Sequence, residues 1–215
     1  MSIIDTWDRV TRKAWDSFIQ EEKLSAQQAD KFERYMTLMS EFNAVTNITR
    51  IMEPKDVINY HFRDSLALAH ARDLTACKGL CDVGSGGGFP GIPLAILFPE
   101  LPIILLEISQ KKRSFLQAVI DELELSSCQV MGEDYLTFIR STSYPLDYFV
   151  ARASLRAGEL IRALNSPSYK QVEIVYWASQ HWEAEAPEKS FLAERYAYKV
   201  EGQHRFLVFF KRSVH

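Results

Sequence analysis

The residues best suited to chemistry lie in a glycine-rich segment, which has glycine at positions 84, 86, 87, 88 and 91. Glycine permits positive φ and lets a ligand approach the main chain closely. Asp82 lies two residues before the first of these glycines, and Glu107 lies 19 residues after Gly88. The first carboxylate can face an ammonium group, directly or through water, and the second suits the two hydroxyls of a ribose. The segment therefore predicts a site for a ligand that contains a nucleoside.

Two kinds of ligand are compatible with this segment. Gly86, Gly88 and Gly91 match the G-x-G-x-x-G spacing of dinucleotide sites. However, Pro90 and Pro93 remove backbone amides where a pyrophosphate would bind. The other ligand is a nucleoside with an amino-acid tail, for which the preceding carboxylate and bare glycine backbone are well suited. A plain tight turn without a ligand is the third interpretation.

The elements that must position this segment alternate between strand and helix after residue 78. Short apolar runs predict strands over residues 79–83, 102–107, 128–131, 146–151 and 172–177, and the intervening patterns predict helices over 109–125 and 154–164. Near the end, 195–200 and 205–211 flank a turn and predict an antiparallel hairpin. Together these predict an α/β fold with a mostly parallel, doubly wound sheet that the hairpin makes mixed.

The first part of the chain has the pattern of helices. Apolar residues from Ile4 to Phe18 recur at helical spacing, and Ser25 with Gln28 has the spacing of a capping box. We expect the helix that begins at Ser25 to continue through Phe42. A polar loop is expected over 43–50, and a third helix is expected from Pro54 towards Ala71. The predicted organisation is a helical extension over residues 1–75 and a ligand-binding domain over residues 76–215.

Composition limits the classes of protein that fit. The 215 residues are 47% hydrophobic and 25% charged, which is ordinary for a folded soluble chain. With 25 basic and 28 acidic residues the net charge is −3, so contact with nucleic acid requires a local basic face. No export signal is visible, and prolines and Glu100 interrupt the most apolar stretch, 92–106. We therefore expect a cytoplasmic protein without a membrane span.

Cysteine and histidine spacing indicates neither a disulfide framework nor a metal site. The three cysteines, at positions 77, 81 and 128, include no pair of pairs typical of zinc, and the five histidines show no ligand spacing. No bound metal is therefore expected.

The segment 82–96, Asp-Val-Gly-Ser-Gly-Gly-Gly-Phe-Pro-Gly-Ile-Pro-Leu-Ala-Ile, resembles class I S-adenosylmethionine-dependent methyltransferases. More narrowly, it resembles the bacterial glucose-inhibited division protein B family, also called ribosomal small-subunit methyltransferase G. Asn-Ile-Thr at 47–49, His-Phe-Arg-Asp-Ser-Leu at 61–66 and Ala-Arg-Ala at 151–153 are similar to further segments of the family. The resemblance covers residues 25–155 well and is loose beyond 160, where Tyr-Trp-Ala-Ser-Gln at 176–180 stands in place of a Leu-Lys-Gly strand end.

The resemblance implies a Rossmann-like fold and a defined activity. The family transfers a methyl group from S-adenosyl-L-methionine to N7 of a loop guanosine in 16S rRNA, so the implied partner is small-subunit RNA or the assembling subunit. Guanine N7 carries a lone pair already, so in-line positioning suffices and we assign no catalytic acid or base. The alternatives are a class I methyltransferase with another substrate, a nicotinamide-binding oxidoreductase and a non-catalytic RNA-binding module. The sequence does not determine the oligomeric state, for which we assume a monomer.

The resemblance also assigns the candidate site residues. Those expected to bind the cofactor are Asp82, Gly84, Gly86, Gly88, Phe89, Glu107, Glu133, Asp134 and Arg152, and those expected on the substrate side are Asn47, Thr49, His61, Arg63 and Asp64. Several also have structural interpretations. Phe89 is equally a core anchor, Arg152 a salt-bridge residue, His61 a helix–helix contact, and the two acids at 133–134 a helix start. Basic candidates for RNA contact are Arg50, Arg63, Arg152, Arg156 and the run at 111–113.

Overall fold

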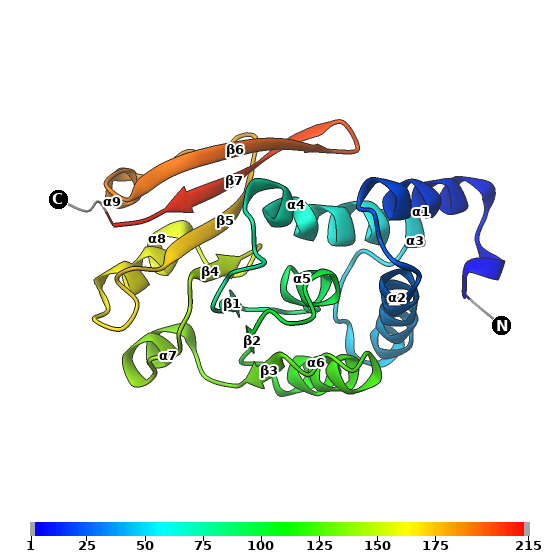
Figure 1. Cartoon of the computed structure of the whole chain (residues 1–215), viewed down its shortest axis with the longest axis horizontal. Coiled ribbons are helices and arrows are strands. Elements are labelled where there is room, and N and C mark those ends of the chain that lie inside the picture. Colours follow the sequence, from blue (N-terminus) through cyan, green and yellow to red (C-terminus); the bar gives the residue numbers. More distant parts are fainter. Residues whose placement is uncertain (1–2, 213–215) are drawn as a thin grey trace.

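The structure is a computed structural model that describes residues 3–212. A mixed sheet of seven strands crosses the molecule, in the order β3-β2-β1-β4-β5-β7-β6 (Figure 1). The strands are β1 (Leu80–Val83), β2 (Ile103–Leu106), β3 (Cys128–Met131), β4 (Tyr148–Ala151), β5 (Glu173–Ser179), β6 (Leu192–Val200) and β7 (Gln203–Phe210). Each of the predicted strands is present, within a few residues of its expected bounds. The predicted α/β fold is therefore confirmed.

Strand pairing follows the burial of the strands. β1 to β5 pair in parallel, and every residue of β1 and β2 is buried, as expected for strands covered on both faces. β7 lies antiparallel between β5 and β6, with an irregular register between Leu192 and Glu194. The predicted hairpin is thus confirmed, with a turn at Glu201 and Gly202. It extends over the helical part of the molecule (Figure 1).

The helices between the strands differ in part from the predicted ones. They are α5 (Gly91–Leu97), α6 (Gln110–Glu122), α7 (Tyr135–Ser141), α8 (Ala157–Leu160) with the 3₁₀ turn η3 (Ile161–Asn165), and α9 (Ala186–Lys189). α6 agrees with its prediction. The helix expected from residue 154 begins only at Ala157, because Arg156 is in the extended conformation, with φ −74° and ψ 150°. No extent was predicted for α7, although the acids at 133–134 were interpreted as a helix start, and Asp134 caps this helix by accepting a hydrogen bond from the Thr137 amide.

The helical extension has the predicted helices with different ends. It comprises η1 (Ile3–Thr6), α1 (Arg9–Glu21), α2 (Ala26–Thr46), α3 (Pro54–Asp56), the π-helical segment η2 (Val57–Arg63) and α4 (Asp64–Ala71). The capping box of Ser25 and Gln28 is confirmed. The predicted start of the loop at residue 43 is wrong, because α2 continues to Thr46. The helix ends where Asn47 takes the left-handed conformation.

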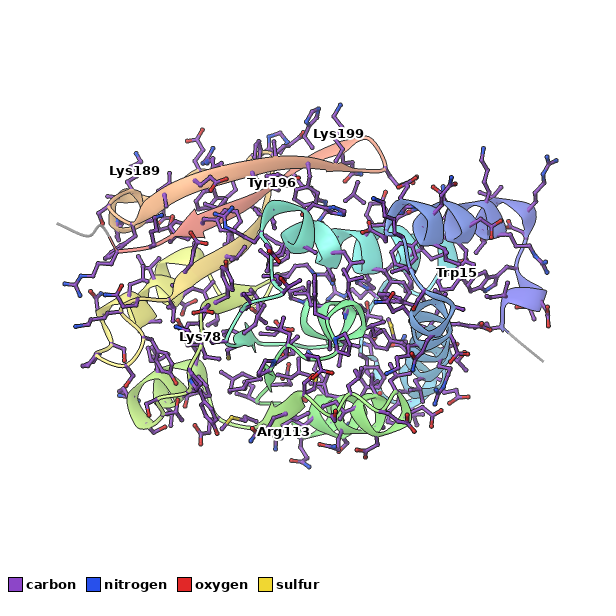
Figure 2. All side chains as sticks on the ribbon, in the orientation of Figure 1. Trp15, Lys78, Arg113, Lys189, Tyr196 and Lys199 are labelled. Carbon is purple, nitrogen blue, oxygen red and sulfur yellow. The ribbon has the colours of Figure 1, made fainter. Side chains whose placement is uncertain are left out.

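Aromatic side chains join the extension to the sheet. Tyr35 of α2 is fully buried and contacts the rings of Phe62, Phe89 and Phe115, and its hydroxyl donates to the carbonyl of Gly87. Trp15 of α1 is labelled in Figure 2, and its ring meets that of Trp7 edge-on, with 5.5 Å between the ring centres. The division into 1–75 and 76–215 stays a prediction. Both parts contribute to one hydrophobic core.

The helices described over residues 3–212 include none that combines the length and apolar character needed to cross a membrane.

Candidate functional site

A cavity of about 820 Å³ opens at the carboxyl ends of β1, β2 and β4, where doubly wound sheets bind their ligands. The loop after β1, the strand ends, the start of α7 and the helical extension each contribute part of its wall. Of the predicted residues, those that line it are Thr49, His61, Asp64, Gly84, Gly86, Phe89, Glu107, Glu133, Asp134 and Arg152. Ten of the fourteen predicted site residues therefore line this cavity.

The loop after β1 presents bare backbone to the cavity. Gly84 and Gly86 have φ of +70° and +60°, which L side chains rarely adopt. A Cβ at Gly86 would come within 4 Å of only one atom, the carbonyl oxygen of Gly84 at 3.8 Å, so this position faces open space. At Gly84 a Cβ would lie 2.5 Å from the Cβ of Ser154. Glycine at these two positions keeps the turn free of side chains.

Glu107 follows β2 and fixes the opposite edge of this turn. Its Oε2 accepts a hydrogen bond from the Gly86 amide at 2.9 Å, and its Oε1 accepts one from the Ser109 amide at 2.9 Å. Each carboxylate oxygen can accept a second hydrogen bond, so the group holds the loop and still presents acceptors to a ligand. The binding of ribose hydroxyls by Glu107 stays a prediction, which these acceptors allow.

Asp82 lies beneath the loop instead of at the cavity surface. It is fully buried, does not line the cavity, and its Oδ2 accepts a hydrogen bond from the Gly91 amide at 2.9 Å. Burial raises its pKa from 3.8 to about 7. Asp82 therefore has no place on the cavity surface from which to face a ligand directly, and contact through water stays a prediction. The carboxylate instead ties the end of β1 to the start of α5.

Gly88 also differs from its expected role. A Cβ at Gly88 would lie 2.6 Å from Ile92 and 2.7 Å from the Tyr35 hydroxyl. The side of this residue from which a side chain would project therefore faces the core and not the cavity. This glycine permits close packing of the extension, α5 and α6 beneath the loop.

Phe89 was interpreted both as a cofactor-binding residue and as a core anchor, and its position is compatible with both. It is 5% exposed and packs on Tyr35 in the core, yet it lines the cavity. The His61 ring stacks on it at 4.2 Å, and the Arg152 guanidinium lies 4.9 Å from its ring centre. It therefore supports two polar residues of the cavity wall.

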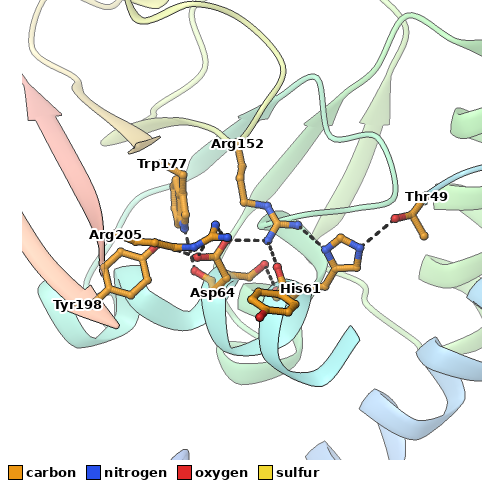
Figure 3. Close-up of polar contacts among 9 residues, drawn as sticks. Thr49, His61, Asp64, Arg152, Trp177, Tyr198 and Arg205 are labelled. Carbon is orange, nitrogen blue, oxygen red and sulfur yellow. Dashed lines mark hydrogen bonds and ion pairs between the residues drawn. The ribbon is translucent and has the colours of Figure 1, made fainter. Parts of the chain in front are cut away.

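A chain of polar contacts joins the extension to the end of β4 (Figure 3). Arg152 places Nη2 3.1 Å from His61 Nδ1, and His61 Nε2 lies 2.9 Å from the Thr49 hydroxyl. Since arginine can only donate, His61 Nδ1 must accept and Nε2 carries the proton. Burial and the charge of Arg152 lower the pKa of His61 to about 3, so the ring is neutral at physiological pH.

Asp64 is the centre of the same cluster. It is fully buried and accepts hydrogen bonds from Arg152 at 3.0 Å, Tyr198 at 2.7 Å and Arg205 at 3.3 Å (Figure 3). Its backbone carbonyl accepts a fourth, from the Trp177 indole at 2.7 Å. The carboxylate thus holds side chains from β6, β7 and the end of β4 against the extension, and it is one charge shared by two guanidiniums.

Acidic residues after β3 form the far wall of the cavity. Asp134 accepts hydrogen bonds from the amide and hydroxyl of Thr137 as the cap of α7, so the helix-start interpretation is correct for it. Glu133 Oε2 is buried without a hydrogen-bond partner among the residues that the structure describes. An unpartnered buried acceptor on the cavity wall is a group that a ligand can satisfy.

Two predicted substrate residues lie away from the cavity. Arg63 pairs with Glu21 and Ser17 of α1 and covers the ring of Phe18, so it joins helices of the extension. Asn47 does not line the cavity, and its backbone ends α2. Sequence spacing gave no information on which way these side chains point.

The structure also brings in residues that the sequence did not indicate. Tyr60, Ser154, Gln203 and Arg205 line the cavity as well, together with Lys112 from the basic run that was considered for RNA contact. Arg205 and Gln203 belong to β7, in the part of the chain where the resemblance is loose. Of the basic candidates, Arg113 donates to the carbonyls of Glu107 and Ile108 and supports the loop after β2. Among residues 3–212, no group of three or more metal-ligating side chains is brought together.

Comparison with protein families identifies the chain. The family model described as GidB, rRNA small subunit methyltransferase G, matches residues 28–207. The chain belongs to this family. The rRNA small subunit methyltransferase G of Desulfitobacterium hafniense is 40% identical over 141 residues, which are 65% of this chain and 58% of that protein. That of Geobacillus kaustophilus is 39% identical over 140 residues, 64% of this chain and 59% of that protein. The matches span a little under three fifths of these relatives of the methyltransferase G family.

Solved structures share the fold of this rRNA small subunit methyltransferase G family member. A point mutant of MtNAS in complex with S-adenosylmethionine superposes with a TM-score of 0.60 at 15% identity, over 93% of this chain and 84% of that one. Magnesium protoporphyrin IX methyltransferase of Synechocystis PCC 6803 with bound SAM gives 0.53 at 16% identity, over 83% and 97%. At these identities the likeness establishes a Rossmann-like α/β fold.

Proposed function

We propose that the chain binds S-adenosyl-L-methionine and transfers its methyl group to N7 of a guanosine in small-subunit rRNA. The observation that carries the proposal is the bare turn at Gly84 and Gly86, which faces the cavity beside Glu107. Membership of the rRNA small subunit methyltransferase G family supports the substrate class. We place this activity in the cytoplasm, on RNA or the assembling subunit.

The cavity residues fit this cofactor. The open side of Gly86 leaves room for a ligand against the main chain, and Glu107 has acceptors for ribose hydroxyls. The unpartnered Glu133 Oε2 can accept a hydrogen bond from an adenine amino group at the other side of the wall. When bound, the cofactor supplies an electrophilic methyl group. Asp82 would act from below, by holding the loop and α5 in place.

The protein contributes position and charge more than proton transfer. Guanine N7 needs no deprotonation, and His61, the histidine of this wall, is held neutral by burial and Arg152. Alignment of the reacting atoms of the base and the cofactor would raise the rate of transfer, and the dipoles and charges of the cavity wall would add to this effect. We therefore assign His61 and Asp64 to holding Arg152, not to acid–base catalysis.

Two measurements test the proposed function. Calorimetry should find S-adenosylhomocysteine bound more tightly than NAD, and tighter binding of NAD would refute the cofactor assignment. Single-turnover reactions with labelled cofactor and unmethylated small-subunit particles, followed by mapping of the modified nucleotide, should place the methyl group on a loop guanosine. Absence of transfer at saturating cofactor would leave a binding protein and refute the enzyme.

A further inference from the structure

A second cavity, of about 670 Å³, adjoins the first and has no role in the proposed methyl transfer. Its walls are the end of β5, the segment 179–182, Gly202 of the β6–β7 turn and the start of β7 at residues 203–205. Arg152, Ala153, Gln203 and Arg205 line both cavities, so these residues form the boundary between them. Its volume lies within the range of about 300–1,000 Å³ that small-molecule and cofactor sites occupy.

The boundary carries positive charge. Asp64 contributes one negative charge, Arg152 and Arg205 contribute two positive charges, and His61 is neutral, so the cluster has a net charge of +1. Within residues 3–212, no carboxylate lines the second cavity. An anionic group that approaches from the second cavity would therefore meet a net positive charge, in which Asp64 offsets only one of the two guanidiniums.

Arg205 has hydrogen-bond donors to offer such a group. Its Nη1 contacts both oxygens of Asp64, at 3.4 and 3.3 Å, and its guanidinium lies 5.9 Å from the Tyr60 ring centre. Its Nε and Nη2 bond to no other residue in the described part of the chain, and the side chain is 31% exposed. A guanidinium that is held at one nitrogen can donate hydrogen bonds from its two other nitrogens to the oxygens of a phosphate. Arg152, in contrast, uses both terminal nitrogens within the cluster.

The remaining walls suit a nucleobase. His181 and His204 present exposed imidazoles, and Gln203 presents an amide that can pair with a base edge. The Gln180 amide nitrogen lies 3.0 Å from His181 Nε2, so this pair already shares a hydrogen bond. Trp182 is less available, because it packs on Tyr176 and Phe210 and Arg195 lies 5.1 Å from its ring centre. Bases of single-stranded RNA stack on exposed rings such as the imidazoles of His181 and His204.

We propose that the second cavity binds the RNA nucleotide next to the methylated guanosine, and that Arg205 binds the phosphate joining the two nucleotides. The inference rests on the proposed function, in which the target base enters the first cavity. The base of the neighbouring nucleotide binds within the second cavity, whose lining includes His181 and His204. This assigns the last part of the chain to substrate recognition.

The test measures the affinity of small-subunit particles for the full chain in saturating S-adenosylhomocysteine. H181A and H204A should each weaken binding about fivefold or more, the effect of losing one stacked base. R205Q should also lower the slope of log K against log salt by about 0.7–0.9, because one phosphate contact is lost. R205K, which keeps the charge, should restore most of that slope. H70A removes an exposed histidine outside both cavities and should match the unsubstituted chain.

The outcomes separate this proposal from the proposed function. Unchanged affinity in both histidine variants, or an unchanged salt slope in R205Q, overturns the subsite. If the unsubstituted chain binds the particles but transfers no methyl group, the proposed methyltransferase activity is refuted. In that case the affinities of the variants still show whether the second cavity binds RNA. Ultraviolet cross-linking should join residues 179–182 or 203–205 to a nucleotide beside the methylated guanosine. A cross-link to a ribosomal protein overturns the assignment to RNA.

Discussion

Replacing Asp64 by asparagine should lower the free energy of unfolding by about 3–5 kcal/mol, the usual cost of removing one partner from a buried ion pair. The Asp64 side chain is 1% exposed, and its carboxylate faces Arg152, Arg205 and the Tyr198 hydroxyl. An asparagine oxygen can still accept from Tyr198, but its amide group then points its donors at a guanidinium. Arg152, with a side chain 12% exposed, cannot turn to water and keeps most of the uncompensated charge.

Urea denaturation of the ligand-free protein measures this loss as a lower midpoint with an unchanged m value. The melting temperature should fall by roughly 6–20 °C, at about 2–4 °C per kcal/mol for a chain of this size. Glu21→Gln is the matched control, because Glu21 is 60% exposed in its pair with Arg63 and should contribute less than about 1 kcal/mol. If D64N loses no more than this control, the buried carboxylate does not hold the cluster as described.

Three other results are expected. Gly86→Asp should abolish S-adenosylhomocysteine binding by calorimetry, because its side chain and charge would enter the cavity. Gly202→Asp, also at a positive-φ glycine with open space but away from the first cavity, should keep that binding, and equal affinities would contradict the placement of the ligand. The pKa of Asp82 is about 7 in the folded chain against about 3.9 unfolded, so its contribution to stability is present below about pH 4 and is lost as pH rises to 7. D82N should remove this decline and raise the free energy of unfolding at pH 8 by a few kcal/mol; denaturation at several pH values without such a gain would contradict the burial argument. The pKa of His61, about 3, lies below its unfolded value, so its contribution to stability is lost as pH falls below about 6.5. NMR should find its ring neutral from pH 5 to 8, and a midpoint near 6.5 would contradict the described cluster.

The sheet and the glycine loop were predictable because their signals are local. Continuous apolar runs identified β1 and β2, and Ser25 with Gln28 identified the start of α2. The end of α2 was placed too early, since Asn43 and Thr46 are weak helix formers and helical continuation there depends on the contacts of a folded chain. α7 has only seven residues, too few to show a helical period.

The site was less predictable because side-chain direction depends on tertiary contacts. Asp82 and Glu107 both follow or end a strand, yet one is directed under the loop and the other onto the cavity wall. Arg63 and His61 lie two residues apart on η2, and they point to α1 and to the cavity respectively. Arg205 reaches Asp64 across 141 positions of sequence, a pairing that no local pattern contains.

The position of β6 has a consequence for how copies of the chain meet. β6 is the last strand of the sheet, so one side of its backbone is free of strand partners. It exposes Glu194, Arg195 and Lys199, the last of which is labelled in Figure 2, and its pairing with β7 is irregular near Leu192. A strand from another molecule added here would have to match this distorted edge and approach three charged side chains. Aggregation through continued β-pairing is disfavoured at the longest open edge of the molecule.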